Sequence, residues 1–143
     1  MSSQRDLVLT RLYRWEKELK DRVFLTQPLP GGGVTTFTFG QAMDEARRMA
    51  AHLRSRGFAP GSSVAILSKN CAQLILSDIA IWMAGYVSVV IYPTLGADTI
   101  SYILSHCNAK ALFVGKLDGW ESQAEAVPTA VACISYQPGT QPG

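Results

Sequence analysis

The sequence predicts an α/β fold: a mostly parallel sheet with helices on both faces, preceded by a short β-hairpin. Three observations support this. From residue 40 onward, segments with the apolar spacing of helices alternate with short apolar segments typical of strands. The connections between these segments are short and rich in Gly, Pro or Asn. Such alternation favours parallel strands joined by right-handed crossovers through helices.

The first part of the chain is predicted to form a helix and a hairpin. Residues 4–20 have the spacing of an amphipathic helix. Residues 23–26 and 34–39 are predicted strands, joined by the Pro- and Gly-rich loop 27–33. This loop is not interpreted as a phosphate loop, because neither a helix nor a Lys-Ser/Thr pair follows it directly. The apolar side of the helix carries Leu7, Leu12, Trp15 and Leu19.

The remaining predicted elements alternate regularly. In order they are helix 40–56, strand 64–67, helix 71–84, strand 87–91, helix 97–107, strand 111–114, helix 120–126 and strand 130–134. Helix 71–84 is apolar nearly all round, which indicates that it is buried. On helix 97–107 a single face carries Ile100, Ile103, Leu104 and Cys107.

The stretch 71–92 is long enough to be tested as a membrane span, since only Asp78 in it is charged. Gly85 divides the stretch and a β-branched run follows, so a helix, a turn and a buried strand are predicted instead. Asn70 is expected to cap the helix, with Gln73 as its capping-box partner. Asp78 is either a functional carboxylate or, as we favour, a residue at the rim or paired with a neighbour.

Three regions are expected along the chain. Residues 1–39 form the N-terminal helix and hairpin, and residues 40–136 form the α/β subdomain. Residues 137–143 have the Pro, Gly and Gln composition of a flexible tail. Because the chain ends in a linker just after a strand, it is expected to be a piece of a larger enzyme.

Composition excludes several classes of function. The formal net charge is +2 and no basic stripe with interleaved aromatic residues occurs, so nucleic-acid binding is not expected. Cys71, Cys107 and Cys133 are odd in number and widely spaced, which indicates buried free thiols in a reducing compartment, here the cytoplasm. His52 and His106 lack ligand-type spacing, so no metal site is predicted. No secretory signal opens the chain.

Three blocks of the sequence carry a resemblance to a known superfamily. The run 57–70 resembles the G-x-x-x-G-D-x-V-A-I-x-x-x-N stretch of adenylate-forming enzymes, with Ser62 where the family usually has Asp. The runs 80–94 and 102–114 are similar to the next two blocks, in family order and spacing, and Phe37-Thr38-Phe39 fits upstream. The resemblance implies the N-terminal subdomain of the adenylate-forming fold.

The run Ile91-Tyr92-Pro93-Thr94 is similar to a turn of long- and medium-chain fatty acyl-CoA synthetases. The resemblance implies an AMP-forming parent enzyme that uses ATP and Mg²⁺ to convert a carboxylic or fatty acid to an acyl-adenylate, then to a thioester with coenzyme A. In such chemistry the phosphates require cationic and N–H stabilisation in the transition state.

The residues for that chemistry are not found in this sequence. No Ser/Thr/Gly-rich phosphate loop ending in Lys occurs among the 143 residues. We therefore assign no catalytic residue and no metal ligand, expect no cofactor on this chain alone, and predict that the isolated chain is inactive. Its expected partners are the rest of the parent enzyme and, in the whole protein, the fatty acid substrate.

Candidate ligand-contacting residues are restricted to two places. Tyr92, Pro93 and Thr94, continuing to Leu95-Gly96, form a turn where a parallel strand ends, which is the usual ligand position in such sheets. Gly85 could allow close backbone approach near a coenzyme A path. Ordinary turn geometry is the competing interpretation at both places.

Two other functions remain open at this stage. The chain could be a stand-alone, non-catalytic α/β interaction module whose sheet edge recruits a partner or closes a homodimer. It could also be a flavodoxin-like nucleotide binder, but the short connection 67–70 has no glycine, which counts against that interpretation.

Overall fold

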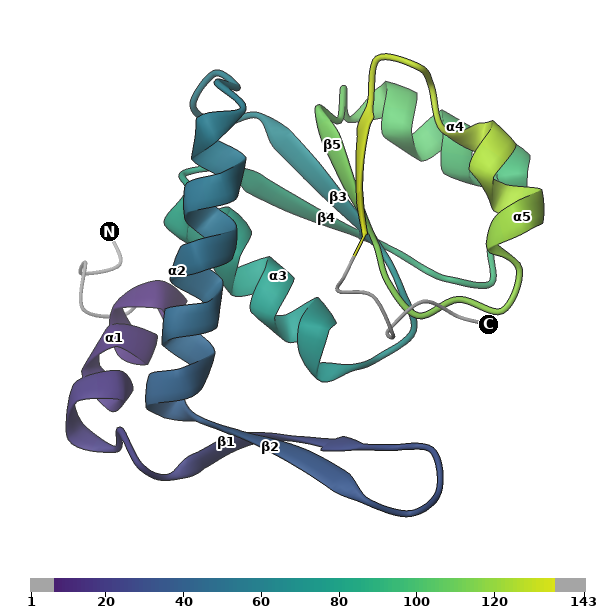
Figure 1. Ribbon diagram of the computed structural model, residues 1–143. Helices are drawn as coiled ribbons and strands as arrows, with labels where there is room; N and C mark the ends of the chain where they lie inside the picture. Colours follow the sequence, from purple (N-terminus) through teal and green to yellow (C-terminus); the bar gives the residue numbers. More distant parts are fainter. Residues whose placement is uncertain (1–6, 136–143) are drawn as a thin grey trace.

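The computed structural model describes residues 7–135 and confirms the predicted α/β fold (Figure 1). The elements are α1 (Val8–Glu18), β1 (Val23–Pro28), β2 (Val34–Thr38), α2 (Phe39–Ser55), β3 (Ser63–Leu67), α3 (Ala72–Met83), β4 (Val87–Ile91), α4 (Ala97–His106), β5 (Ala111–Val114), α5 (Trp120–Gln123), the 3₁₀ helix η2 (Ala124–Ala126) and β6 (Ala132–Ser135). The predicted flexible tail 137–143 lies outside the described residues.

The four strands of the main sheet are all parallel and lie in the order β4-β3-β5-β6. Alternate residues of each strand point to opposite faces. Val64 and Ile66 of β3 pack with residues of α2 and α3, whereas Ala65 and Leu67 pack with α4 and the α5–η2 segment. Helices therefore cover both faces of the sheet, as Figure 1 shows.

The hairpin β1–β2 forms a separate two-stranded antiparallel sheet that extends away from the main sheet (Figure 1). Gly31 and Gly32 adopt φ of 92° and 97° at its tip, a conformation that glycine reaches at low cost. The hairpin then leads into α2 through a capping box, in which Gln41 N–H donates to Thr38 Oγ1 at 3.1 Å and Thr38 N–H donates to Gln41 Oε1 at 3.0 Å.

The start of α3 differs from the prediction. Asn70 does not cap the helix with Gln73: the N-cap residue is Cys71, and its side chain makes no capping hydrogen bond. Instead the backbone N–H of Ala72 donates to Gln27 Oε1 of the hairpin at 2.7 Å. A helix start needs acceptors for its free N–H groups, and here a residue distant in sequence supplies one.

The predicted apolar side of α1 is also only partly correct. Leu12 is buried, but Leu7 is 52% exposed and Trp15 38% exposed, because α1 packs mainly on α2 and lies at the margin of the core. The stretch 71–92 divides into α3, a turn and β4, as predicted. Across residues 7–135, none of the helices combines the length and apolar character needed to cross a bilayer.

Candidate functional site at the carboxyl edge of the sheet

Parallel α/β sheets bind ligands beyond the carboxyl ends of their strands, at the point where successive connections turn to opposite faces. Here β3 continues into α3 on one face, while its neighbour β5 continues into α5 and η2 on the other face. The loops 68–71 and 115–119 therefore define the switch point. We use the name β3/β5 crevice for this topological position, where the two loops meet.

Buried Ser68 organises the crevice. Its side chain belongs to a residue that is only 2% exposed, and its hydroxyl donates to the carbonyl of Lys69 at 2.8 Å and accepts from the N–H of Lys116 at 3.0 Å. Two backbone bonds join the same loops: Lys69 N–H to Lys116 O at 2.7 Å, and Gly115 N–H to Leu67 O at 2.9 Å. The two loops are thus held against each other.

The two lysines on the crevice loops, Lys69 and Lys116, differ in their pairing. Lys69 Nζ forms an ion pair with Asp118 Oδ2, and both side chains reach solvent, at 39% and 79% exposure. The ammonium is neutralised, and several loop N–H groups already have protein acceptors. Lys116, on the other loop of the crevice, is exposed and forms no ion pair among the described residues.

The turn predicted to contact ligand lies at the same edge, after the outer strand β4. Tyr92 is 75% exposed, Thr94 is exposed and Pro93 is half-buried. The turn is tied to α5 by Gln123, whose Nε2 donates to the carbonyl of Pro93 at 2.9 Å and that of Leu95 at 3.3 Å. Gln123, Ser68 and the Lys69–Asp118 pair had not been singled out from the sequence.

Gly85 lies at the opposite end of β4 from this turn, so the structure does not bring the two candidate places together. Its φ of 84° explains a glycine in the turn between α3 and β4. A Cβ built on Gly85 would have no atom within 4 Å among the described residues, so none of them makes the close backbone approach considered above.

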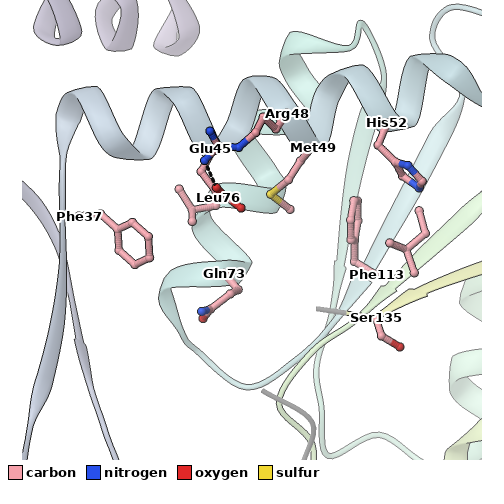
Figure 2. A pocket seen from close by; sticks show the side chains of 10 residues that line it. Phe37, Glu45, Arg48, Met49, His52, Gln73, Leu76, Phe113 and Ser135 are labelled. Atoms are coloured by element: carbon pink, nitrogen blue, oxygen red, sulfur yellow. Dashed lines mark hydrogen bonds and ion pairs between the residues drawn. The ribbon is translucent and has the colours of Figure 1, made fainter. Parts of the chain in front are cut away.

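A groove of about 640 Å³ lies between α2, α3 and the β5–β6 side of the sheet (Figure 2). Its apolar part is formed by Phe37, Met49, Leu76, Phe113 and Ile134. Gln73, near the start of α3, and Ser135, the last residue of β6, also line it, so the groove reaches the carboxyl edge.

The polar rim of this groove comes from α2, where Glu45, Arg48 and His52 lie (Figure 2). Arg48 forms an ion pair with Glu45, and this hydrogen bond raises the pKa of Arg48 above its ordinary value. Arg48 is therefore always charged and is paired within its own helix.

The remaining candidate residues show no assembled chemistry. Asp78 is half-buried, which agrees with a position at the rim. Its Oδ1 atom is buried and has no hydrogen-bond partner among residues 7–135, so no pairing through that atom is observed. Cys71 and Cys107 are half-buried free thiols, but Cys133 is exposed, contrary to prediction, because it lies on the edge strand β6. The described residues contain no group of three or more His, Cys, Asp or Glu side chains suited to a metal ion.

Comparison with known proteins defines the class. A sequence profile of the family described as "AMP-binding enzyme" matches residues 12–141. The chain therefore belongs to the AMP-binding enzyme family, and the resemblance to adenylate-forming enzymes is confirmed.

Individual relatives agree with this family. The chain is 35% identical over 83 residues to a probable CoA ligase of Humulus lupulus and 32% identical over 83 residues to long chain acyl-CoA synthetase 2 of Arabidopsis thaliana. Each alignment covers 58% of this chain, which spans only 13% and 12% of those two relatives. A benzoate CoA ligase structure from Burkholderia xenovorans LB400 shares the fold, with a TM-score of 0.74 and 22% identity over 94% of this chain and 26% of the ligase.

Proposed function

We propose that this chain is the N-terminal portion of an AMP-forming acyl-CoA synthetase. The parent would activate a carboxylic or fatty acid with ATP and Mg²⁺ to an acyl-adenylate, then transfer the acyl group to coenzyme A. The observation that carries the proposal is the family match over residues 12–141 together with the CoA ligase and acyl-CoA synthetase names of the relatives. The Ile91–Thr94 turn supports a fatty acyl substrate.

Within the parent, the described residues would supply scaffold rather than reacting groups. A carboxylate becomes a good electrophile only after adenylation, and the phosphates must be stabilised by cations and N–H groups. In the β3/β5 crevice Lys69 is paired with Asp118, and the N–H groups of Lys69, Gly115 and Lys116 have protein acceptors. No Ser/Thr/Gly-rich phosphate loop ending in Lys occurs among the 143 residues. We therefore assign no catalytic residue to this chain and propose that it is inactive alone.

We propose the same three regions as expected from the sequence: residues 1–39 as the N-terminal helix and hairpin, residues 40–136 as the α/β subdomain, and residues 137–143 as a flexible tail. Free cysteines support a reducing compartment, for which we propose the cytoplasm.

An exchange assay tests the proposal. ATP–pyrophosphate exchange should be measured with fatty acids of increasing chain length, for the pure 143-residue chain and for the protein encoded when the reading frame is followed past Gly143. We expect exchange with the longer protein and none with the chain alone. Robust exchange by the chain alone would contradict the proposal that this chain lacks the catalytic groups. A longer protein that shows no exchange with any carboxylic acid would contradict the proposal that the parent is a synthetase.

A second candidate function is a stand-alone interaction module, favoured by one observation. β4 lies at the edge of the main sheet, and its Val87 and Val90 are 52% and 51% exposed. An apolar edge of this kind can pair with another chain, including a second copy. A stop codon directly after Gly143, together with a dimer by light scattering that the Val90→Lys substitution dissociates, would favour the module over the synthetase.

A further inference from the structure

Gln123 is a buried polar residue whose side chain is bound on one side only. The residue is 6% exposed and lies at the junction of α5 and η2. Its Nε2 group donates to two carbonyls two residues apart, at 2.9 Å to Pro93 and 3.3 Å to Leu95. Its Oε1 atom is buried and has no hydrogen-bond partner among residues 7–135.

The orientation of this amide follows from its surroundings. The reversed amide would place Oε1 against two carbonyl oxygens, which repel it, so the turn selects the orientation with Nε2 inward. That orientation leaves the oxygen unpaired, which is unfavourable in a buried position. Methionine has a similar volume and would fill the space without an unpaired atom, so packing alone does not explain glutamine here.

The two hydrogen bonds act on a segment in which Leu95 packs against the core but few other hydrogen bonds are made. Within the turn itself, Leu95 N–H donates to Tyr92 O at 3.3 Å, a long bond. Gly96 is the N-cap of α4 and has no side chain with which to cap it. Fixing the carbonyls of Pro93 and Leu95 therefore also fixes the direction in which the chain enters α4.

We propose that Gln123 is a positioning residue that holds the Tyr92–Gly96 turn in one shape at the carboxyl edge of the sheet. Through this turn it presents Tyr92 and Thr94, both exposed, to whatever occupies that edge. The link between the turn and an acyl-CoA synthetase substrate rests on the proposed function. The hydrogen bonds from Gln123 to the turn do not rest on the proposed function, and they are tested on this chain alone.

The test is amide hydrogen exchange by NMR, with Leu95 as the reporter and Ile66 of the central strand β3 as the reference. In Gln123→Met we expect Leu95 to exchange about tenfold faster, the equivalent of one lost hydrogen bond, while Ile66 is unchanged. The matched control is Gln73→Met, since the Gln73 side chain makes no hydrogen bond with the described residues; it should leave Leu95 as in the wild type.

A second variant distinguishes hydrogen-bond donation by the Gln123 side chain from the mere filling of space by it. Gln123→Glu keeps the shape but, when ionised, has no donor, so Leu95 should again exchange faster. Acidification that protonates the introduced carboxyl returns one donor and should slow Leu95 relative to its intrinsic exchange rate. A residue that merely fills space would show no such rescue.

Two results would overturn the proposal. One is wild-type exchange at Leu95 in a folded Gln123→Met protein. The other needs no variant: the Nε2 protons of Gln123 in the wild-type chain, if they exchange as fast as those of an exposed glutamine, are not bonded to the turn. Slow exchange of these protons supports the tie even if a variant fails to fold.

Discussion

The two ends of the parallel strands are built differently. At the amino end, the chain turns by means of backbone conformation: Gly57, Gly61 and Gly85 adopt φ of 75°, 79° and 84°, and Asn108 adopts 53°. Backbone bonds then connect the turns, as from Gly61 N–H to the carbonyl of Gly85 at 3.0 Å. Two side chains add bonds to backbone carbonyls there, Tyr86 Oη to Phe58 at 3.1 Å and Arg54 Nη1 to Met83 at 3.2 Å. The four turn positions require residues that tolerate positive φ, and their own side chains do little.

At the carboxyl end, side-chain hydrogen bonds and an ion pair add to the backbone bonds between the loops. Ser68 holds the loop after β5, Lys69 is paired with Asp118, and Gln123 holds the turn after β4. Bonds of this kind can be exchanged for bonds to a ligand or to another part of a larger enzyme, whereas a turn fixed by φ cannot. The contrast indicates that the amino end is scaffold and the carboxyl end is where function can be placed.

The largest expected change in the free energy of unfolding is in the core between the two ends of the strands. It is the reference against which the smaller changes at either end are compared. Leu104 of α4 is 1% exposed and packs with Leu67, Ile91 and Leu112. Leu104→Ala should lower the free energy of unfolding by about 2–5 kcal/mol in chemical denaturation. Tyr102→Ala, at a position 67% exposed on the same helix, is the control and should change it far less. Equal losses of stability in the two variants would contradict the orientation of α4 in which Leu104 is buried and Tyr102 is exposed.

The next effect tests the carboxyl end. Ser68→Ala removes the acceptor of Lys116 N–H inside the crevice, and we expect a loss of about 1–2 kcal/mol. Ser105→Ala, on the exposed side of α4, makes the same chemical change and should be nearly neutral. If Ser68→Ala is neutral by the same denaturant measurement, the crevice is held by its backbone alone and the contrast between the two ends fails.

The sequence was sufficient for the elements but not for the contacts between distant residues. Apolar spacing predicted every strand of the main sheet, since burial imposes a repeat that is visible locally. The cap of α3 was assigned to Asn70 because it stands at the right offset, yet the acceptor for Ala72 N–H is Gln27, 45 residues away. Local spacing contains no information about such a partner.

The same limit applies to the candidate site. The turn 92–96 was placed correctly at the end of a strand, because Pro marks it in the sequence. Gln123 is a polar residue in a weakly helical stretch, and nothing in its neighbours indicates that it is buried or faces that turn. Strand order decides which loops meet, and β3 next to β5 cannot be read from alternation alone.

A smaller effect tests the amino end. Gly85→Ala introduces a Cβ at φ 84°, where space is open but the conformation is strained, and should cost about 1 kcal/mol. Gly96→Ala is matched: it also has open space, but its φ of −71° suits any residue, so it should be neutral. Thermal unfolding of both variants compares them directly. If Gly85→Ala leaves the stability unchanged, the positive φ of Gly85 is not what holds the turn at the amino end of the strands.

The smallest expected effect is that of the Lys69–Asp118 ion pair, and it decides whether charge at the carboxyl end is structural. Because both side chains reach solvent, a double-mutant cycle of Lys69→Met and Asp118→Asn should give a coupling of about 0.2–1 kcal/mol that falls as salt is raised. The Arg14–Glu18 pair, exposed on α1, serves as the control for an isolated surface pair. A weak, salt-sensitive coupling means that Lys69 can leave Asp118 for an anion at little cost. A coupling well above 1 kcal/mol and insensitive to salt would instead mean that the pair fixes the two loops permanently, and the carboxyl end would then be scaffold in the same sense as the glycine turns at the amino end.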